Sequence, residues 1–170
     1  IDLIFNIELG EKAKISQIEF IGDKKIKDRT LRNIIISEED KFWKFISKKK
    51  YLNKSLISRD ERLLKNFYLD KGYYDINISS STVDYFDDKS FKLTYKINAG
   101  EKYTINLTKL ELPQDYDEEN FKNVSKLLKK LINQTYSLNK ITKIVDEIDK
   151  ISLSRAFEFI NADILENKID

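Results

Sequence analysis

The chain has 170 residues, of which 41% are hydrophobic and 35% are charged, and 31 basic residues nearly balance 29 acidic ones for a net charge of +2. This balance gives no strong pull towards nucleic acid or anionic lipid. Cysteine and histidine are both absent, which excludes disulfides, thiol catalysis and the usual transition-metal ligands. No apolar run approaches the roughly 18 residues that a membrane-spanning helix needs. We therefore expect no enzyme, no cofactor and no metal site.

An internal repeat organises the sequence. The segment FNIELGEKAKI at 5–15 matches YKINAGEKYTI at 95–105, which places Gly10 and Gly100 90 residues apart. A second pair, RLLKNFYLDKGYYDI at 62–76 and DEIDKISLSRAFEFI at 146–160, follows in the same order at an offset of 84 residues. Two matches in the same order predict tandem copies of one structural unit.

The first complete unit begins with a predicted strand over Ile15–Ile21. Asp28 is expected to cap a short helix, and a charged connection then runs over Ser37–Asn53. Ser55 or Ser58 is expected to start a second helix, the latter through a Ser-x-x-Glu capping box. The apolar positions of the two helices lie three and four residues apart, as on a helix that packs one face: Leu31, Ile34 and Ile35 in the first, and Leu56, Leu63, Leu64, Phe67 and Tyr68 in the second.

The second helix is expected to end at Gly72, because glycine tolerates the left-handed backbone at a helix end. Two more strands follow. In the first of them the apolar side chains alternate with polar ones, and their parity changes at Val83 and Tyr85, which indicates a β-bulge. Asp87–Asp88 is predicted to make the turn into the last strand. The inward positions of that last strand are Phe91, Leu93, Tyr95 and Ile97.

The unit thus has the order β-α-α-β-β and an α+β fold. One apolar face per strand predicts a sheet that helices cover on one side only. The last strand has the cleanest apolar alternation, so we place it in the centre with the other two strands at the edges. The strand after Gly72 is then an exposed edge.

Paired carboxylates occur at Glu38-Glu39-Asp40, Asp87-Asp88 and Glu118-Glu119. Acid–base catalysis needs such groups in a water-poor cleft with split pKa values, whereas turns and first helical turns favour solvated acids. We interpret all three clusters as solvated. The helical stripe at 141–151 is interpreted as core.

The segment FWKFISKKKY at 42–51 mixes aromatic and basic residues, which is typical of contacts with phosphate or lipid. The alternative is a connection in which Trp43 and Phe45 pack on the domain while Lys48, Lys49 and Lys50 stay in water. We favour this second interpretation.

The candidate functional site is the edge strand after Gly72. Unpaired N–H and C=O groups along a sheet edge can bind another strand with little regard to its sequence. Polar residues and a bulge can also blunt such an edge, which is the alternative. The predicted site residues are Tyr74, Asp75, Ile76, Asn77, Ile78, Ser79, Ser80 and Ser81. A second edge strand of the same kind is predicted in the second unit at Phe157, Phe159 and Ile160.

Several motifs together resemble the POTRA (polypeptide-transport-associated) domain family, most closely the periplasmic repeats of the BamA type. They are Gly10-Glu11, ISQIEFIGDKKI at 15–26, the tryptophan of KFWKF at 41–45, Lys50-Tyr51 and YLDKGY at 68–73. The resemblance implies tandem repeats, each a three-stranded mixed sheet with two helices on one face. Residues 1–10 would end one repeat, 11–100 would form the next (the third by resemblance), and 101–170 would form a following repeat without its closing strand, so that the chain is a fragment of a longer protein.

The resemblance also implies a function and partners. The chain would be a non-enzymatic periplasmic module of an outer-membrane protein assembly machine. Its partners would be unfolded outer-membrane protein clients, BamB-like accessory lipoproteins and a C-terminal membrane barrel of the same protein, with no nucleic acid. Two alternatives remain. One is a KH-like RNA-binding module, although no two glycines of this chain stand three apart as a Gly-x-x-Gly loop requires. The other is POTRA repeats of a two-partner secretion transporter that act mainly as rigid spacers.

Overall fold

The structure, a computed structural model, describes residues 3–5, 13–41, 43, 46–85, 90–114, 116–155 and 162–169. The chain divides into two compact units, Ile1–Phe67 with Asp75–Gly100 and Tyr68–Tyr74 with Glu101–Asp170. The predicted turn at Asp87–Asp88 and the predicted second edge strand, with Phe157, Phe159 and Ile160, lie outside the described residues.

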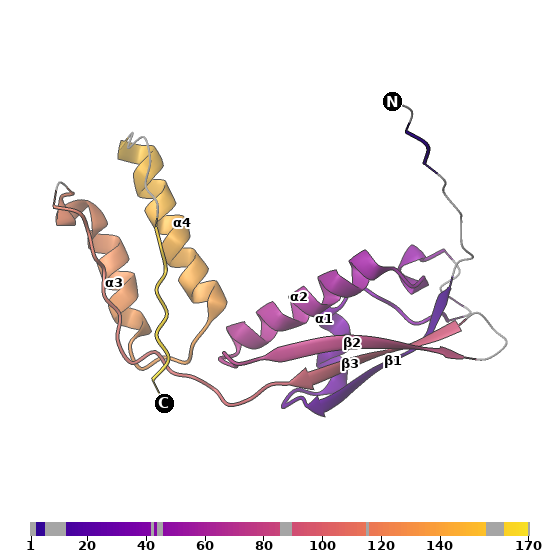
Figure 1. The fold of residues 1–170 in the computed structure, drawn as a ribbon. Coiled ribbons are helices and arrows are strands. Elements are labelled where there is room, and N and C mark those ends of the chain that lie inside the picture. The colour runs from indigo at the N-terminus through magenta and orange to yellow at the C-terminus, as the bar shows by residue number, and fades with distance from the viewer. Residues whose placement is uncertain are drawn as a thin grey trace. The chain divides into compact units, whose positions relative to one another are not determined.

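Nine helices and strands are found in the described part of the chain (Figure 1). In chain order they are β1 (Lys14–Asp23), α1 (Asp28–Ile34), the 3-10 helix η1 (Lys48–Lys50), α2 (Lys54–Asp70), β2 (Asn77–Tyr85), β3 (Ser90–Asn98), the 3-10 helix η2 (Glu118–Phe121), α3 (Lys122–Leu131) and α4 (Leu138–Arg155).

The first unit contains a three-stranded sheet with the order β1-β3-β2. β1 runs parallel to β3 and β2 runs antiparallel to it. This arrangement confirms the α+β class and the central position of the last strand. β3 lies between the two other strands, and its inward side chains Leu93, Tyr95 and Ile97 are almost fully buried.

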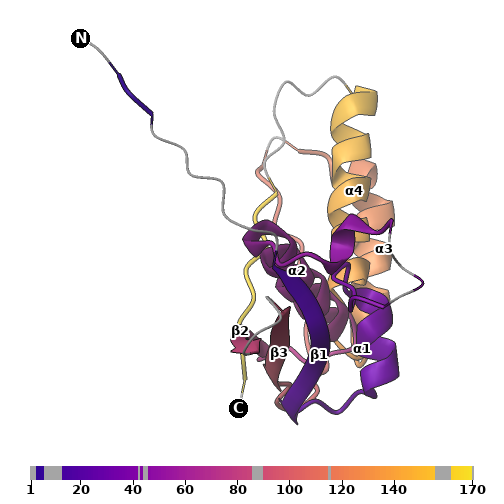
Figure 2. The ribbon, with the colours of Figure 1, turned by 90° about the vertical axis from the view of Figure 1, so that its right-hand side faces the viewer.

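Helices α1 and α2 lie against one face of this sheet (Figures 1 and 2). Each contributes a fully buried leucine, Leu31 from α1 and Leu64 from α2. β1 supplies Ile15, Ile18 and Phe20 to the same core, while the neighbouring Ser16 and Gln17 are exposed. The one-sided burial follows the alternation of apolar and polar residues.

A β-bulge lies in β1 rather than in β2. The pairing of β1 with β3 shifts between Ile15 and Gln17, and the hydroxyl of the extra residue, Ser16, donates a hydrogen bond to the Phe91 carbonyl at 3.1 Å. The extra residue brings Ile15 and Ile18, three positions apart, onto one face. β2 pairs with β3 without a shift from Asn77 to Tyr85, so the bulge predicted there is wrong.

The helix starts also differ from the prediction. Lys27 is the N-cap of α1, and Asp28 is the first helical residue, where its carboxylate forms an ion pair with Lys24 at 2.5 Å. α2 begins at Lys54, because the Asn53 side chain accepts hydrogen bonds from the two backbone N–H groups at Ser55 and Leu56. Asn53 therefore takes the capping position that was predicted for a serine.

The second unit contains η2, α3 and α4. Phe121, Val124, Leu131 and Ile144 form its buried core, and Ile141, Ile148 and Ile151 pack against this core. This confirms the predicted apolar stripe of the last helix. In the described part of the chain, no helix has the length and apolar character that crossing a membrane requires.

Candidate functional site

β2 is an edge strand, as predicted. Among the described residues it has one strand neighbour, β3, and so one of its two hydrogen-bonding sides carries no strand. Along its first half Asn77, Ser79 and Ser81 are exposed, whereas Ile78 and Ser80 are half-buried. A continuous register from Asn77 to Tyr85 keeps this edge straight, without the local twist that a bulge would add.

The structure places the first three predicted site residues before this strand. Tyr74 and Asp75 form a turn and Ile76, which is 6% exposed, precedes the first ladder residue, Asn77. The edge therefore begins three residues later than the alternation suggested. The five other predicted residues, Asn77 to Ser81, all belong to β2.

Tyr74 has a different role, because it belongs to the second unit. Its hydroxyl donates a hydrogen bond to Glu166 at 2.9 Å, and the Tyr136 hydroxyl donates to the other oxygen of the same carboxylate at 3.1 Å. Burial, with the negative charge of Glu166, raises the pKa of Tyr136 above its ordinary value. Tyr136 therefore stays a protonated donor at neutral pH.

Gly72 is required by its surroundings in the second unit. Its φ is +95°, and a Cβ atom at this position would lie 2.3 Å from the Thr135 methyl group. Its carbonyl accepts a hydrogen bond from the Tyr103 N–H at 2.9 Å. The glycine is thus needed for a left-handed turn and for a close approach.

The opposite edge of the sheet, on β1, is covered by the connection between α1 and α2. The Leu52 N–H donates to the Ala13 carbonyl at 2.8 Å, and the Asp40 N–H donates to the Ile15 carbonyl at 2.7 Å. A single antiparallel bridge joins Lys14 to Tyr51. The two edges of this sheet therefore differ: residues of the first unit itself occupy the β1 edge, whereas no strand in the described part of the chain borders the β2 edge.

The acidic cluster at 38–40 was predicted to be solvated, but in the structure it holds this connection in place. Asp40 forms ion pairs with Lys50 at 2.7 Å and with Lys14 at 3.1 Å. Hydrogen bonds from these two ammonium groups lower the pKa of the Asp40 carboxyl. Lys50 is only 6% exposed, so its predicted position in water is also wrong, and the reason is this ion pair. Glu118 and Glu119, in contrast, lie in the first turn of η2, as predicted.

Two large apolar side chains of the same connection are exposed. Trp43 is 59% exposed and Ile46 is 83% exposed, so the prediction that Trp43 packs on the domain is wrong. Lys41 lies 5.8 Å from the centre of the Trp43 ring, and Lys48 and Lys49 are exposed. Phe45 lies outside the described residues.

Asp60 is an important residue that the sequence analysis missed. It lies on α2 and is fully buried. Its carboxylate accepts hydrogen bonds from the N–H groups of Ile36 and Ser37 at 2.6 and 3.2 Å and from the Tyr95 hydroxyl at 2.9 Å. Burial and the neighbouring Asp60 charge raise the pKa of Tyr95, which keeps its hydroxyl a donor. Asp60 thus fixes α2 to the central strand and to the start of the connection.

A three-stranded mixed sheet with the helices of a β-α-α-β-β unit on one face and an edge strand after the second helix defines the POTRA class of domain. Residues 13–100 match the POTRA family, described as "Surface antigen variable number repeat". The chain belongs to this family.

Two curated relatives extend the similarity over most of the chain. The outer membrane protein assembly factor BamA of Neisseria meningitidis serogroup B is 27% identical over 148 residues, which cover 87% of this chain and 18% of that protein. The BamA of Buchnera aphidicola subsp. Acyrthosiphon pisum is 31% identical over 150 residues, which cover 85% of this chain and 23% of that protein. The chain therefore corresponds to a small part of each relative.

Solved structures share the fold. The Haemophilus influenzae BamA POTRA3-5 structure has a TM-score of 0.59 at 16% identity and covers 86% of this chain and 52% of its own. POTRA1-2 of the periplasmic domain of Omp85 from Anabaena has a TM-score of 0.50 at 9% identity, and covers 92% of this chain and 90% of its own. These similarities show a shared fold.

Proposed function

We propose that the chain is a non-enzymatic periplasmic module of an outer-membrane protein assembly machine, and that β2 binds extended segments of client polypeptides or of accessory lipoproteins as an added strand. Family membership and the names of the relatives support the first part of this proposal. They favour it over the KH-like alternative, which shares only the combination of helices and a small sheet.

The observation that carries the second part is the difference between the two sheet edges. β2 has no strand on its outer side among the described residues, whereas groups of the first unit itself bind the backbone of β1. Main-chain hydrogen bonds supply most of the affinity in strand addition. They depend little on the sequence of the added strand, which suits a module that meets many different clients.

The polar character of β2 is compatible with such transient binding. Its exposed side chains in the first half, at Asn77, Ser79 and Ser81, are short and polar, and like all strand side chains they stand on the faces of the sheet, not where an adjacent backbone would lie at about 4.8 Å. Neither the predicted bulge nor Asp75 lies in the strand, which removes two features that would have blunted the edge.

Proline substitutions at Ser79 and Ser80 test this proposal. Backbone N–H groups of neighbouring residues in an antiparallel strand point to opposite sides, so one of the two prolines removes a donor to β3 and the other removes an outward donor. The outward proline should keep the circular dichroism spectrum and weaken binding of a labelled, unstructured peptide of alternating valine and threonine by roughly threefold to tenfold, the contribution of one neutral hydrogen bond.

The inward proline serves as the matched control, because it should destabilise the sheet. Unchanged peptide affinity in the correctly folded outward variant would exclude strand addition at β2. A chain that binds no extended peptide at all would favour the spacer alternative.

A further inference from the structure

The outward carbonyl groups of β1 are occupied along most of the strand. Besides the bonds to Ala13 and Ile15 from the connection, the Lys24 ammonium donates to the Phe20 carbonyl at 3.0 Å, and the Lys24 N–H donates to the Gly22 carbonyl at 3.0 Å. Ile18 lies between Ile15 and Phe20, at the centre of this edge. Its backbone N–H and C=O are the groups to which another strand could bind there.

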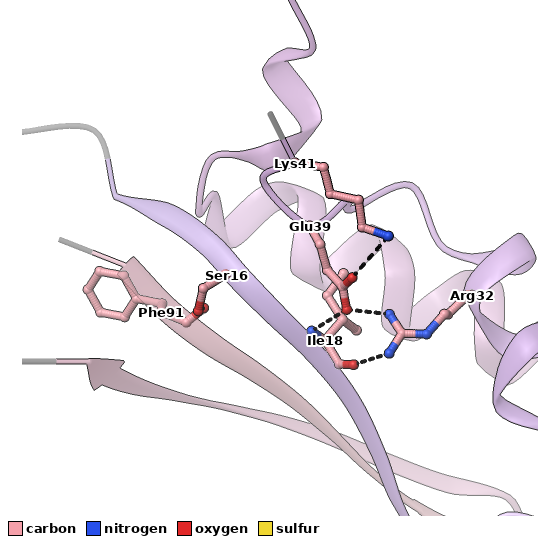
Figure 3. A network of polar contacts seen from close by, with 6 residues as sticks. All are labelled: Ser16, Ile18, Arg32, Glu39, Lys41 and Phe91. Carbon is pink, nitrogen blue, oxygen red and sulfur yellow. Dashed lines mark hydrogen bonds and ion pairs between the residues drawn. The ribbon is translucent and has the colours of Figure 1, made fainter. Parts of the chain in front are cut away.

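Two side chains bind both backbone groups of Ile18 (Figure 3). The Ile18 N–H donates to the Glu39 carboxylate at 3.0 Å, and the Ile18 carbonyl accepts from the Arg32 guanidinium at 2.5 Å. The second nitrogen of the guanidinium donates to the same Glu39 oxygen at 2.6 Å. Arg32 comes from α1 and Glu39 from the connection, so two different segments meet at this point.

The pair reproduces what a neighbouring strand would supply. In a β-ladder a residue that points to its neighbour donates its N–H and accepts at its C=O, and here a carboxylate and a guanidinium take the two partner positions. The planar fork of arginine holds its N–H donors in a fixed geometry that suits two neighbouring acceptors, whereas the lysine ammonium is a point charge without that fixed geometry. We call this arrangement of Arg32, Glu39 and the Ile18 backbone the β1 clasp.

Charge and burial strengthen the β1 clasp. The side chain of Glu39 is 18% exposed, and Lys41 provides a second cation at 3.6 Å. Burial alone would raise the pKa of Glu39, but the Ile18 N–H, the Arg32 hydrogen bond and the charges of Arg32 and Lys41 together lower it. The carboxylate is therefore ionised at neutral pH and is a strong acceptor.

We propose that Arg32 and Glu39 determine the specificity of strand binding, because the β1 clasp closes the β1 edge to extended polypeptides and confines strand addition to β2. This inference rests on the proposed function of β2, but it concerns the β1 edge of the sheet. The partner that it excludes is an extended backbone of any sequence, including the edge strand of a second copy of this chain. Opening the clasp frees the Ile18 backbone, at the centre of the β1 edge, for an added strand.

The test uses the whole 170-residue chain with substitutions that open the clasp by different amounts. Glu39→Ala removes the acceptor for the Ile18 N–H, whereas Glu39→Gln keeps an acceptor oxygen and loses the charge. Arg32→Lys keeps the charge and loses the fork. Glu19→Gln is the matched control, because Glu19 lies on the same strand and its carboxylate forms an ion pair with the Lys92 ammonium at 2.7 Å, away from the backbone at Ile18.

The first measurement is hydrogen exchange of the Ile18 amide by NMR. The exchange should be about 10- to 100-fold faster in Glu39→Ala, in line with the loss of one hydrogen bond to a charged group. Glu39→Gln should show a smaller acceleration, and Glu19→Gln should leave the Ile18 amide unchanged. The amides of Leu93 and Ile97, inside the sheet, should keep their protection in all variants and so report that the sheet is intact.

The second measurement locates bound peptide at each edge. The bound valine–threonine peptide should slow hydrogen exchange of the outward amides within Asn77–Thr82 in the unaltered chain, and should slow exchange of the Ile18 and Phe20 amides as well in Glu39→Ala and Arg32→Lys. Unchanged Ile18 exchange, or variants that never take up peptide at β1, would overturn the inference.

The two edges are read from different amides, so the two proposals fail separately. If the peptide slows no amide exchange within Asn77–Thr82, the proposed function of β2 is wrong, whatever happens at β1. If the peptide slows Ile18 exchange in the unaltered chain, the blocking role of the β1 clasp is wrong, even if β2 also binds. Should Glu39→Ala prevent folding, Glu39→Gln and Arg32→Lys provide the same comparison.

Discussion

The buried hydrogen bond between Tyr95 and Asp60 gives the sharpest test of what stabilises the first unit. Tyr95→Phe removes only the hydroxyl that donates to Asp60 over 2.9 Å. The ring remains and keeps its stacking on Phe20, at 5.6 Å between ring centres. Because no large cavity is created, the cost should come almost entirely from the lost hydrogen bond.

The magnitude follows from the charge of the acceptor. A hydrogen bond to a charged group contributes about 1.5–3 kcal/mol, so the free energy of unfolding should fall by about 2 kcal/mol. For a domain of about 60–100 residues each kcal/mol lowers the melting temperature by roughly 4–8 °C, which predicts a decrease of roughly 8–16 °C for the first unit.

The assay is a urea titration in which the amide signals of β3 are followed by NMR, because these signals report the first unit separately from the second. Asp60→Asn should lower the free energy of unfolding more than Tyr95→Phe. The carboxylate accepts hydrogen bonds from three donors, and the amide NH₂ of asparagine would face at least one of them. Because a donor that faces a donor makes no hydrogen bond, a buried polar group is then left unsatisfied. In the Asp60→Asn background, Tyr95→Phe should cost clearly less than it does alone.

Two results would contradict this reasoning. A loss below about 0.5 kcal/mol in Tyr95→Phe would mean that the hydroxyl contributes no more than an ordinary surface group. Fully additive effects of the two substitutions would mean that the two side chains are not coupled.

Two further predictions concern glycine and acid. Gly22→Ala and Gly72→Ala both place a side chain at positive φ, which costs about 1–2 kcal/mol each. Gly22→Ala should lower the melting temperature more, because its Cβ would lie 2.3 Å from the Ile97 backbone carbonyl, whereas the Cβ of Gly72→Ala meets a side-chain methyl group. Equal destabilisation by the two substitutions would refute this comparison. The pKa of Glu39 is lowered in the folded chain from its ordinary 4.5, so its contribution to stability is complete above that value and is lost as the pH falls below it. Urea titrations at a series of acidic pH values should show a smaller loss in Glu39→Gln, and an identical pH profile would contradict the β1 clasp.

Local patterns predicted the elements of the first unit well. The alternation from Phe91 to Ile97 identifies a strand whose apolar residues share one face, and Leu93, Tyr95 and Ile97 are indeed almost fully buried. The spacing of the apolar residues likewise identifies α2, in which Leu64 and Tyr68 are fully buried. Both patterns reflect the repeat of side-chain directions within one strand or one helix, so residues close together in the sequence are enough to reveal them.

Buried polar groups could not be predicted in the same way. Asp60 stands beside Glu61 in an ordinary charged stretch, and its partner Tyr95 is 35 positions away. Lys50 is the last of three consecutive lysines, yet it alone of the three is buried, next to Asp40. No local signal distinguishes these residues from solvated ones, because their burial depends on partners that only folding brings close.

The sequence by itself determined that the first unit has an edge strand after Gly72 and a central strand at the end, because these follow from apolar alternation and chain order. Only the tertiary structure decided which edge is open. Every residue carries the same backbone donor and acceptor, so the strand patterns of β1 and β2 cannot show whether these groups have partners. The path of the chain after β1 decides it, because α1 brings Arg32 to the Ile18 backbone from 14 positions away and the connection brings Glu39 from 21, while nothing in the described residues covers β2 in this way.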